Sequence, residues 1–320
     1  MAYENVDYSD VITEQLLERD KQLQEKELPE INIGQAVPVT EGLDFATEEW
    51  EYGVTEVRGS VKNGVIGIKT TSLETIDSTI EAKKSPVVQW AKGLVYTQQE
   101  IEKAQKLGIN LPAKKQNDLY ANAVATIQYA GYVGHEQKPG QEGLLTGKQV
   151  EVYNDTSGKT LEEMSSEEFV KMILGAYDKV WSRSDYTIQP ANIAMDAKDF
   201  MTAMQKFDPN PQIVGTDLLP IAAMDRVMAA LRKASQNDSF NVNFVKIPAG
   251  YAKNINKNKS RLVIYTPDED YLEMKVHMPE ILEVMRKDLL SYQSGYRSAF
   301  TGVMWKEPKS AQYLDYKSSK

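Results

Sequence analysis

The chain has 320 residues, of which 41% are hydrophobic, so it can bury a core in one large domain or in two of ordinary size. No apolar run approaches the ~20 residues needed to cross a bilayer, and the acidic start "MAYENVDYSD" lacks the basic-then-apolar build of a secretory signal. The absence of cysteine excludes disulfides and thiolate metal sites, and it fits assembly in a reducing cytoplasm.

The net charge of -9 is concentrated at the N-terminus. Residues 1–51 hold 14 acidic and 3 basic side chains, a balance of -11, whereas the remaining residues hold 32 and 34, a balance of +2. Such an acidic arm is poorly suited to nucleic acid and well suited to a basic patch on a partner; the alternative is a solvated tail. Its stretch "VITEQLLERDKQLQEKEL" predicts a helix with a thin apolar stripe, ended by Pro29, which needs a partner surface to stay folded.

The next segments predict extended structure. Residues 31–53 indicate extended chain broken by Gly34, Pro38 and Gly42. Residues 53–95 contain short β-branched runs, and Asn63-Gly64 is typical of a hairpin turn. Because few of these residues are bulky and apolar, the ribbon cannot bury much against itself. We therefore expect it to project from the body and to be stabilised by something else.

Helices and a compact α/β region follow. A capping box from Thr97 to Glu100 predicts one helix, and Pro112 begins a longer one with an apolar stripe at four-residue steps that ends at Gly131. A second capping box, Ser165 to Glu168, opens another helix, and "DAKDFMTAMQKF" predicts a short helix capped by Asp196. Alternating helices and strands over residues 160–275 predict a compact α/β unit, after which residues 286–308 return to strand-like chain.

The stretch "GYVGHEQKPGQEGLLTG", residues 131–147, is the strongest candidate for a ligand loop. A phosphate loop needs Gly-x-x-x-x-Gly-Lys-Ser/Thr between a strand and a helix N-terminus, where backbone amides converge on the anion. Here the glycines follow a helix, and Gly147-Lys148 is followed by Gln149. We interpret the segment as a turn and not as a nucleotide site.

Other chemistry-bearing residues stand alone. His135 and His277 are far apart in sequence, so we interpret His135 as a solvent-facing loop residue and His277 as a strand-end residue. No Gly-x-Ser-x-Gly elbow is present, "DEDY" at 268–271 is interpreted as a turn, and the Lys/Asn-rich residues 253–259 as a solvated loop tip. We therefore predict no catalytic, cofactor-binding or metal-binding residues, and no enzyme.

Two stretches resemble a known family. "QWAKGLVYTQQEIEKAQKLGINLPAKKQNDLYANAVATIQYAGYVGHEQKPGQEGLLTG" is similar to tailed-phage major capsid proteins of the Hong Kong 97 type, in the branch related to encapsulin shells. In that branch a short helix leads into a long one and then into Gly-Leu-Leu-Asn, here Gly143-Leu144-Leu145-Thr146 with a different last residue. "RLVIYTPDEDYLEMKVHMPEI" also resembles a strand, acidic turn and strand ending in Met-Pro.

The resemblance implies an α+β, Hong Kong 97-type capsid fold. It implies an N-terminal arm at 1–52, an extended β-hairpin loop at 53–96, a peripheral domain with a long spine helix at 97–150 and 276–320, and an α/β axial domain at 151–275. The implied function is that of a major capsid protein of the virion. It would be assembled in the host cytoplasm into pentamers and hexamers of an icosahedral head enclosing double-stranded DNA.

Its partners would be itself and possible scaffold, portal and decoration proteins, with the DNA bound without sequence specificity and no membrane involved. The lysine–asparagine cross-link of some relatives is not expected, because no such pair can be matched. Two alternatives stay open: an encapsulin-like protein compartment, and a soluble α/β enzyme or ligand-binding protein.

Overall fold

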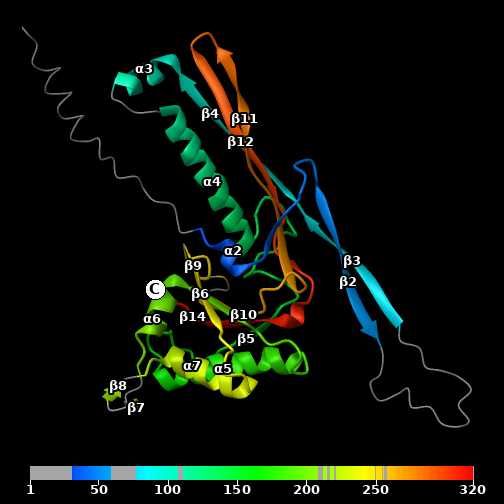
Figure 1. The fold of residues 1–320 in the computed structure, drawn as a ribbon, viewed down its shortest axis with the longest axis vertical. Helices are drawn as coiled ribbons and strands as arrows, with labels where there is room; N and C mark the ends of the chain where they lie inside the picture. Colours follow the sequence, from blue (N-terminus) through cyan, green and yellow to red (C-terminus); the bar gives the residue numbers. More distant parts are fainter. Residues whose placement is uncertain are drawn as a thin grey trace, which may run out of the picture.

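The computed structural model describes residues 31–58, 77–106, 111–207, 212–214, 217–219, 221–248, 250–253, 255 and 258–319. The helix predicted in the arm and the Asn63-Gly64 turn lie outside these residues. Figure 1 shows an upper part in which a long helix runs beside a long sheet, a lower part in which helices cover a second sheet, and a two-stranded ribbon that leaves the body.

The upper part is one sheet backed by the spine helix α4 (Leu111–Val133). Strand β12 is paired along its whole length with β4, and β11 pairs with β12 on the other side through three register shifts. The sheet contains β1 (Val39–Glu41), β11 (Leu272–Asp288), β12 (Ser291–Phe300) and β4 (Val88–Thr97), in this order, with β13 (Met304–Trp305) paired to the start of β11. The predicted stripe Leu119, Ala123, Ile127 and Gly131 is buried, which confirms the helical spacing.

The segment before β1 departs from the extended chain predicted for residues 31–53. Residues Ile33–Ala36 form a short helix, α2, instead. Asn32 holds this turn in place, because its amide donates to the side chain of Gln128 and its side chain accepts from the hydroxyl of Tyr132. A Cβ on Gly131 would lie 2.7 Å from Cδ1 of Ile33, so the glycine of the spine helix makes room for α2.

The lower part is a mixed sheet. The order is β5 (Glu151–Asn154), β14 (Ala311–Lys317), β10 (Lys259–Tyr265), β6 (Asn192–Asp196) and β9 (Asn243–Ile247). Side chains of β10 alternate between two cores. Leu262 and Ile264 pack with α5 (Ser166–Arg183) and α7 (Ala223–Ser235), whereas Val263 and Tyr265 pack with the spine helix and the loop after it. The α/β unit predicted from the alternating elements is therefore present, with both faces of its sheet buried.

The remaining elements are short. The helix α6 (Ala197–Met204) is capped by Asp196, as predicted, and η1 (Pro308–Ser310) precedes β14. The small pair β7 (Gln212–Val214) and β8 (Asp217–Leu219) stands beside α6. Both predicted capping boxes form, at Thr97 before α3 (Gln98–Lys106) and at Ser165 before α5.

Strand β14 crosses the boundary expected between the two domains. It belongs to residues 276–320, which the sequence assigned to the peripheral domain, yet it pairs with β10 over its full length and with β5. The C-terminal strand therefore completes the lower sheet, because its alternating apolar residues Tyr313, Leu314 and Tyr316 fill both cores.

The ribbon is an antiparallel pair of β2 (Glu49–Arg58) and β3 (Asp77–Pro86) that leaves the body (Figure 1). The expected loop at 53–96 is thus wrong at both ends, since β2 begins before it and Val88–Thr97 belongs to the upper sheet as β4. The chain leaves the ribbon and enters the upper sheet where its side chains become apolar. Strand β4 has a buried apolar face formed by Val88, Trp90 and Tyr96, whereas β3 carries the charged Lys83 and Lys84.

Candidate functional site

The loop after the spine helix folds back onto the helix and closes on itself. The amides of Leu144 and Leu145 donate to the carbonyls of Gly131 and Tyr132, and the hydroxyl of Thr146 donates to the carbonyl of Val133. The amide of Gly147 donates to the hydroxyl of Tyr313. Every amide from Gly143 to Lys148 has an acceptor within the protein, so this part of the loop offers no free cluster of amides to a phosphate.

A buried ion pair joins this loop to the lower sheet. Arg261 on β10 contacts Asp315 on β14 through two hydrogen bonds of 2.7 and 2.9 Å, and its Nη1 donates to the carbonyl of Leu145 at 2.7 Å. Its guanidinium lies 4.3 Å from the ring centre of Tyr313. Both charged groups are almost fully buried, so the pair anchors the spine helix to the sheet without presenting a charge to a ligand. A single charge in each of the apolar runs "RLVIY" and "AQYLDY" was the available sequence signal.

His135 is half-buried beside Phe300, so it is not the solvent-facing residue expected. Its Nδ1 accepts from the amide of Gln137 and closes the start of the glycine-rich loop. His277 lies inside β11, opposite Ala299, and not at a strand end as expected. The two histidines make separate contacts, and Nδ1 of His277 lies 3.1 Å from the carbonyl oxygen of Leu43. The acidic turn at residues 268–271 closes through Asp268, as predicted.

No group of three or more His, Cys, Asp or Glu side chains is placed to hold a metal in the part of the chain that the structure describes. Among the helices of these same residues, none is both long enough and apolar enough to cross a membrane.

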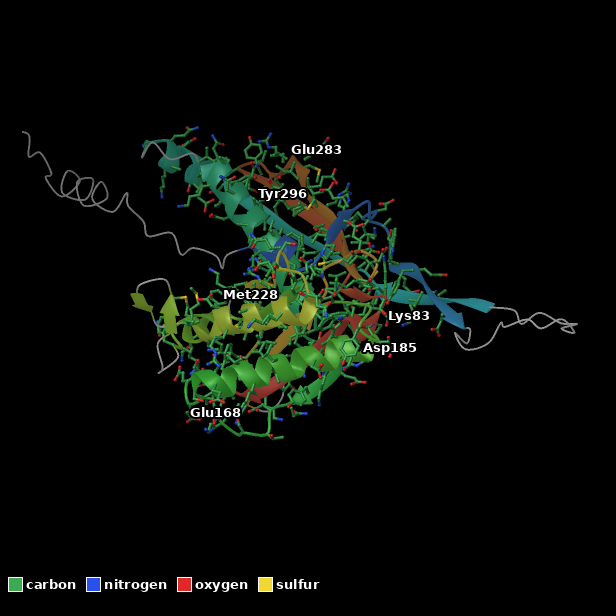
Figure 2. The ribbon with its side chains drawn as sticks, turned by 60° about the horizontal axis from the view of Figure 1, so that its bottom comes forward. Lys83, Glu168, Asp185, Met228, Glu283 and Tyr296 are labelled. Atoms are coloured by element: carbon green, nitrogen blue, oxygen red, sulfur yellow. The ribbon has the colours of Figure 1, made fainter. Side chains whose placement is uncertain are left out.

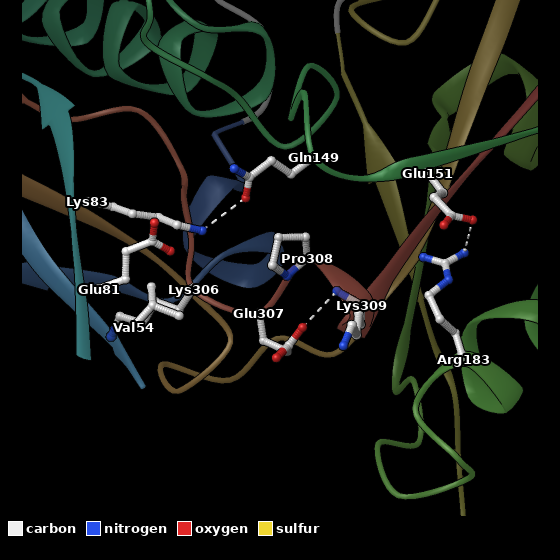
Figure 3. Close-up of a pocket in the computed structure, with 10 residues that line it drawn as sticks. All are labelled: Val54, Glu81, Lys83, Gln149, Glu151, Arg183, Lys306, Glu307, Pro308 and Lys309. Carbon is white, nitrogen blue, oxygen red and sulfur yellow. Dashed lines mark hydrogen bonds and ion pairs between the residues drawn. The ribbon is translucent and has the colours of Figure 1, made fainter. Parts of the chain in front are cut away.

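The surfaces that stand out lie around the ribbon. A groove of about 830 Å³ separates one face of the ribbon from the body, and it is lined by Val54, Glu81, Lys83, Gln149, Glu151, Arg183, Lys306, Glu307, Pro308 and Lys309. Figure 3 shows Lys83 extending across the groove to Gln149, with Nζ of Lys83 3.0 Å from Oε1 of Gln149. On the far side of the groove Arg183 faces Glu151. A second groove of about 370 Å³ continues beneath Tyr52 and Lys84. Beyond its base at Trp50, the described part of the ribbon therefore stands over polar clefts.

A second unusual surface is the distal part of the hairpin formed by β11 and β12. Its tip carries exposed apolar side chains, which we call the distal strip: Ile281, Leu282, Val284, Met285, Leu289, Leu290 and Tyr292. Leu289 is 81% exposed, and no described strand pairs with the outer edge of β11 beyond Val276. Figure 2 shows Glu283 at this end of the molecule and Lys83 on the ribbon, well apart. An exposed apolar strand edge of this length is typical of a surface covered by another chain.

A family model described as major capsid protein matches residues 62–316, which is most of the chain. The chain belongs to the major capsid protein family. No match is found among curated protein sequences.

Solved capsids share its fold. The capsid of Myoviridae phage XM1 is 15% identical, with 91% of this chain and 94% of that chain covered at a TM-score of 0.71. The capsid of a native GTA particle is 10% identical, with 92% and 93% covered at a TM-score of 0.61, and the structure from Mycobacterium phage Adephagia is 10% identical, with 94% of each chain covered at 0.57.

The Hong Kong 97-type capsid fold expected from the sequence is therefore confirmed, as is the role of a capsid-forming protein located in the virion. The likeness covers between 91% and 94% of this chain in these three structures, so it extends over most of the chain. The encapsulin-like alternative is not favoured over it.

Proposed function

We propose that this capsid protein builds a closed icosahedral phage head of pentamers and hexamers around double-stranded DNA. The ribbon carries this proposal. It leaves the body over two polar grooves, and a two-stranded hairpin is at best marginally stable alone in water. It gains stability by lying on an adjacent subunit, and a contact between unlike surfaces of successive copies closes rings and then a shell.

The distal strip supports the same proposal. Seven large apolar side chains exposed at one end of a strand pair favour burial against other copies. We also propose a division into an arm, an extended loop, a peripheral domain with the spine helix and an axial domain. The strands of the loop are then β2 and β3, β4 belongs to the peripheral domain, and β14 belongs to the axial domain.

Scaffold, portal and decoration proteins are further proposed partners, and assembly is proposed to occur in the host cytoplasm. DNA would be enclosed without sequence-specific contacts. The chain would act as structure and not as an enzyme.

Electron microscopy of the full-length protein, expressed alone and with its phage's scaffold, tests the proposal. Rings, tubes or closed shells are expected. Strictly monomeric protein at high concentration with the scaffold present would contradict it and would favour the soluble enzyme or ligand-binding alternative. Shells that enclose a protein cargo in place of double-stranded DNA would favour the compartment alternative.

A pair of variants tests the role of the distal strip. Met285→Asp places a charge on a side chain that is 57% exposed, so it should leave the folded subunit intact and abolish shells. Met285→Leu keeps the apolar contact and should assemble normally. Circular dichroism of both variants checks the subunit, and normal shells from Met285→Asp would exclude this strip from the assembly contacts.

A further inference from the structure

The distal strip is held in a fixed direction by the rest of the upper sheet. Strand β12 is paired with β4 along its whole length, and the hydroxyl of Ser294 donates to the carbonyl of Leu282 at 2.8 Å. At the turn of the hairpin, the amide of Gln98 at the start of α3 donates to the carbonyl of Leu290 at 2.8 Å. The strip is therefore a preformed surface, and a partner binds it without first having to order it.

Most charged side chains of the hairpin are engaged within the subunit. Glu280 forms an ion pair with Arg297 on β12, at 2.8 Å. Arg286 donates to two backbone carbonyls of the turn, and Asp288 accepts a hydrogen bond from the hydroxyl of Ser291. These charges stabilise the hairpin itself and are not available to a partner.

Glu283 and Lys287 differ from the other charges of the hairpin. Both are exposed, and neither makes an ion pair or a side-chain hydrogen bond with a residue that the structure describes. Each lies at a register shift between β11 and β12, one in the shift that follows Leu282 and the other in the shift that follows Arg286. An irregularity of this kind turns a side chain out of the regular alternation of the strand. The two unpaired charges therefore stand at the points where β11 departs from a regular strand.

The order of these charges makes the strip complementary to itself. Glu283 lies two residues before Met285 and Lys287 lies two residues after it. The side chains of Val284 and Met285 between them are each 57% exposed. Two strips that run side by side in the same direction would bring like charges together, which is destabilising. Strips that run in opposing directions bring Glu283 of one copy to Lys287 of the other and bury the apolar side chains between them.

We propose that the distal strip of one copy packs on the distal strip of a second copy, with Glu283 of one beside Lys287 of the other. The inference rests on the proposed assembly and names the partner of this surface as the same surface of another copy. Seven apolar side chains are fewer than the roughly 20–30 residues that a stable interface uses on each side, so the contact acts together with the other contacts of a shell. The alternative is that both charges only protect an exposed edge from unwanted pairing.

Charge reversals separate the two roles. Glu283→Lys and Lys287→Glu each place like charges together, so each should raise the concentration of full-length protein needed for assembly by about tenfold or more. The double variant Glu283→Lys/Lys287→Glu restores opposite charges and should assemble at the concentration of the parent. The single variants change the net charge in opposite directions and the double variant keeps the parent value, so recovery reports the pair and not the net charge. Circular dichroism checks each fold.

A disulfide tests the proximity of the two residues directly. The chain has no cysteine, so Glu283→Cys/Lys287→Cys carries only the two introduced thiols. Within one copy roughly 13 Å of strand separates them, whereas the Cα atoms of a disulfide lie about 4.4–6.8 Å apart. Oxidation of the assembled protein with diamide should therefore link separate copies, which electrophoresis without reductant detects. Glu283→Cys alone and Lys287→Cys alone are the matched controls and should link far less.

The outcomes distinguish this contact from assembly itself. Three results would overturn the contact and leave the proposed shell in place: single reversals that assemble like the parent, a double reversal that stays impaired, or assembled double-cysteine protein without linked copies. Any of them would assign the strip to another surface or to another protein. Absence of assemblies from the parent protein would contradict both the contact and the proposed function.

Discussion

At the scale of single residues, we expect the largest loss of stability when the ion pair between Arg261 and Asp315 is broken. Asp315→Asn leaves a buried guanidinium without its countercharge, and breaking a buried pair costs roughly 3–5 kcal/mol. The denaturation midpoint of unassembled subunits should fall accordingly. Glu49→Gln breaks the exposed pair with Lys84 and should cost under about 1 kcal/mol. Equal losses in the two variants would contradict this reading of the buried pair.

Asp199 gives a prediction about pH. It is buried and accepts a hydrogen bond from the hydroxyl of Tyr316, and burial raises its pKa above the ordinary value. When the pKa of an acid is higher in the folded protein than in the unfolded chain, the free energy of unfolding falls as pH rises from the unfolded to the folded pKa. This loss of stability remains at neutral pH. Asp199→Asn keeps the acceptor without the charge, so it should unfold at a higher temperature than the parent near pH 7 and equal it near pH 3.

Asp199→Ala is the control for the hydrogen bond. It leaves the hydroxyl of Tyr316 without its acceptor and should be destabilised at both pH values. A thermal midpoint for Asp199→Asn below that of the parent at neutral pH would show that the charge is stabilising.

At the scale of elements, the loop after the spine helix depends on close backbone approach. A Cβ at Gly143 would lie 2.5 Å from the carbonyl of Tyr132, so Gly143→Ala should force the loop off the helix and cost about 1–3 kcal/mol. Gly175, in the interior of α5, has nothing within 4 Å, so Gly175→Ala should stabilise by about 0.4–1 kcal/mol. Chemical denaturation compares the two, and a neutral Gly143→Ala would show that the loop adapts.

The ribbon predicts a difference between free and assembled protein. Asn63-Gly64 is expected at or near its tip, which stays a prediction because it lies outside the described residues. Proteases should cut within residues 55–90 of unassembled subunits, and assembly should suppress the cuts because neighbours cover the ribbon. Mass spectrometry of the fragments locates the cuts. Equal protection in both states would indicate that each ribbon packs on its own subunit.

At the scale of the whole molecule, the acidic arm is expected to contribute to assembly. Deleting residues 1–28 should impair shell formation, because both its apolar stripe and its charge are lost. Replacing Glu14, Glu18, Asp20 and Glu25 with glutamine should impair it mainly at low salt, since salt near 1 M shortens the screening length to about 3 Å. Light scattering follows assembly, and normal shells from the deletion would mark the arm as a dispensable tail.

Local chemistry was sufficient for much of the fold. The capping boxes at Thr97 and Ser165, the stripe of the spine helix and the cap at Asp196 were predicted from the sequence, and the structure confirms them. These features depend on residues within a few positions of one another, so the sequence pattern contains all the information that they need. The family resemblance, carried by the order of these elements, then pointed to a capsid protein.

Only the tertiary structure decided which segments meet. The short helix α2 exists because Gln128 and Tyr132 hold Asn32, about a hundred residues away in the chain. Strand β14 joins the lower sheet because its apolar side chains fill both cores and Asp315 pairs with Arg261 on β10. Val88–Thr97 leaves the ribbon because β12 lies beside it. The contact of His277 with Leu43 likewise depends on the pairing of β1 with β11, which are distant in the chain. Such contacts between distant residues are set by packing and register, which no local pattern records.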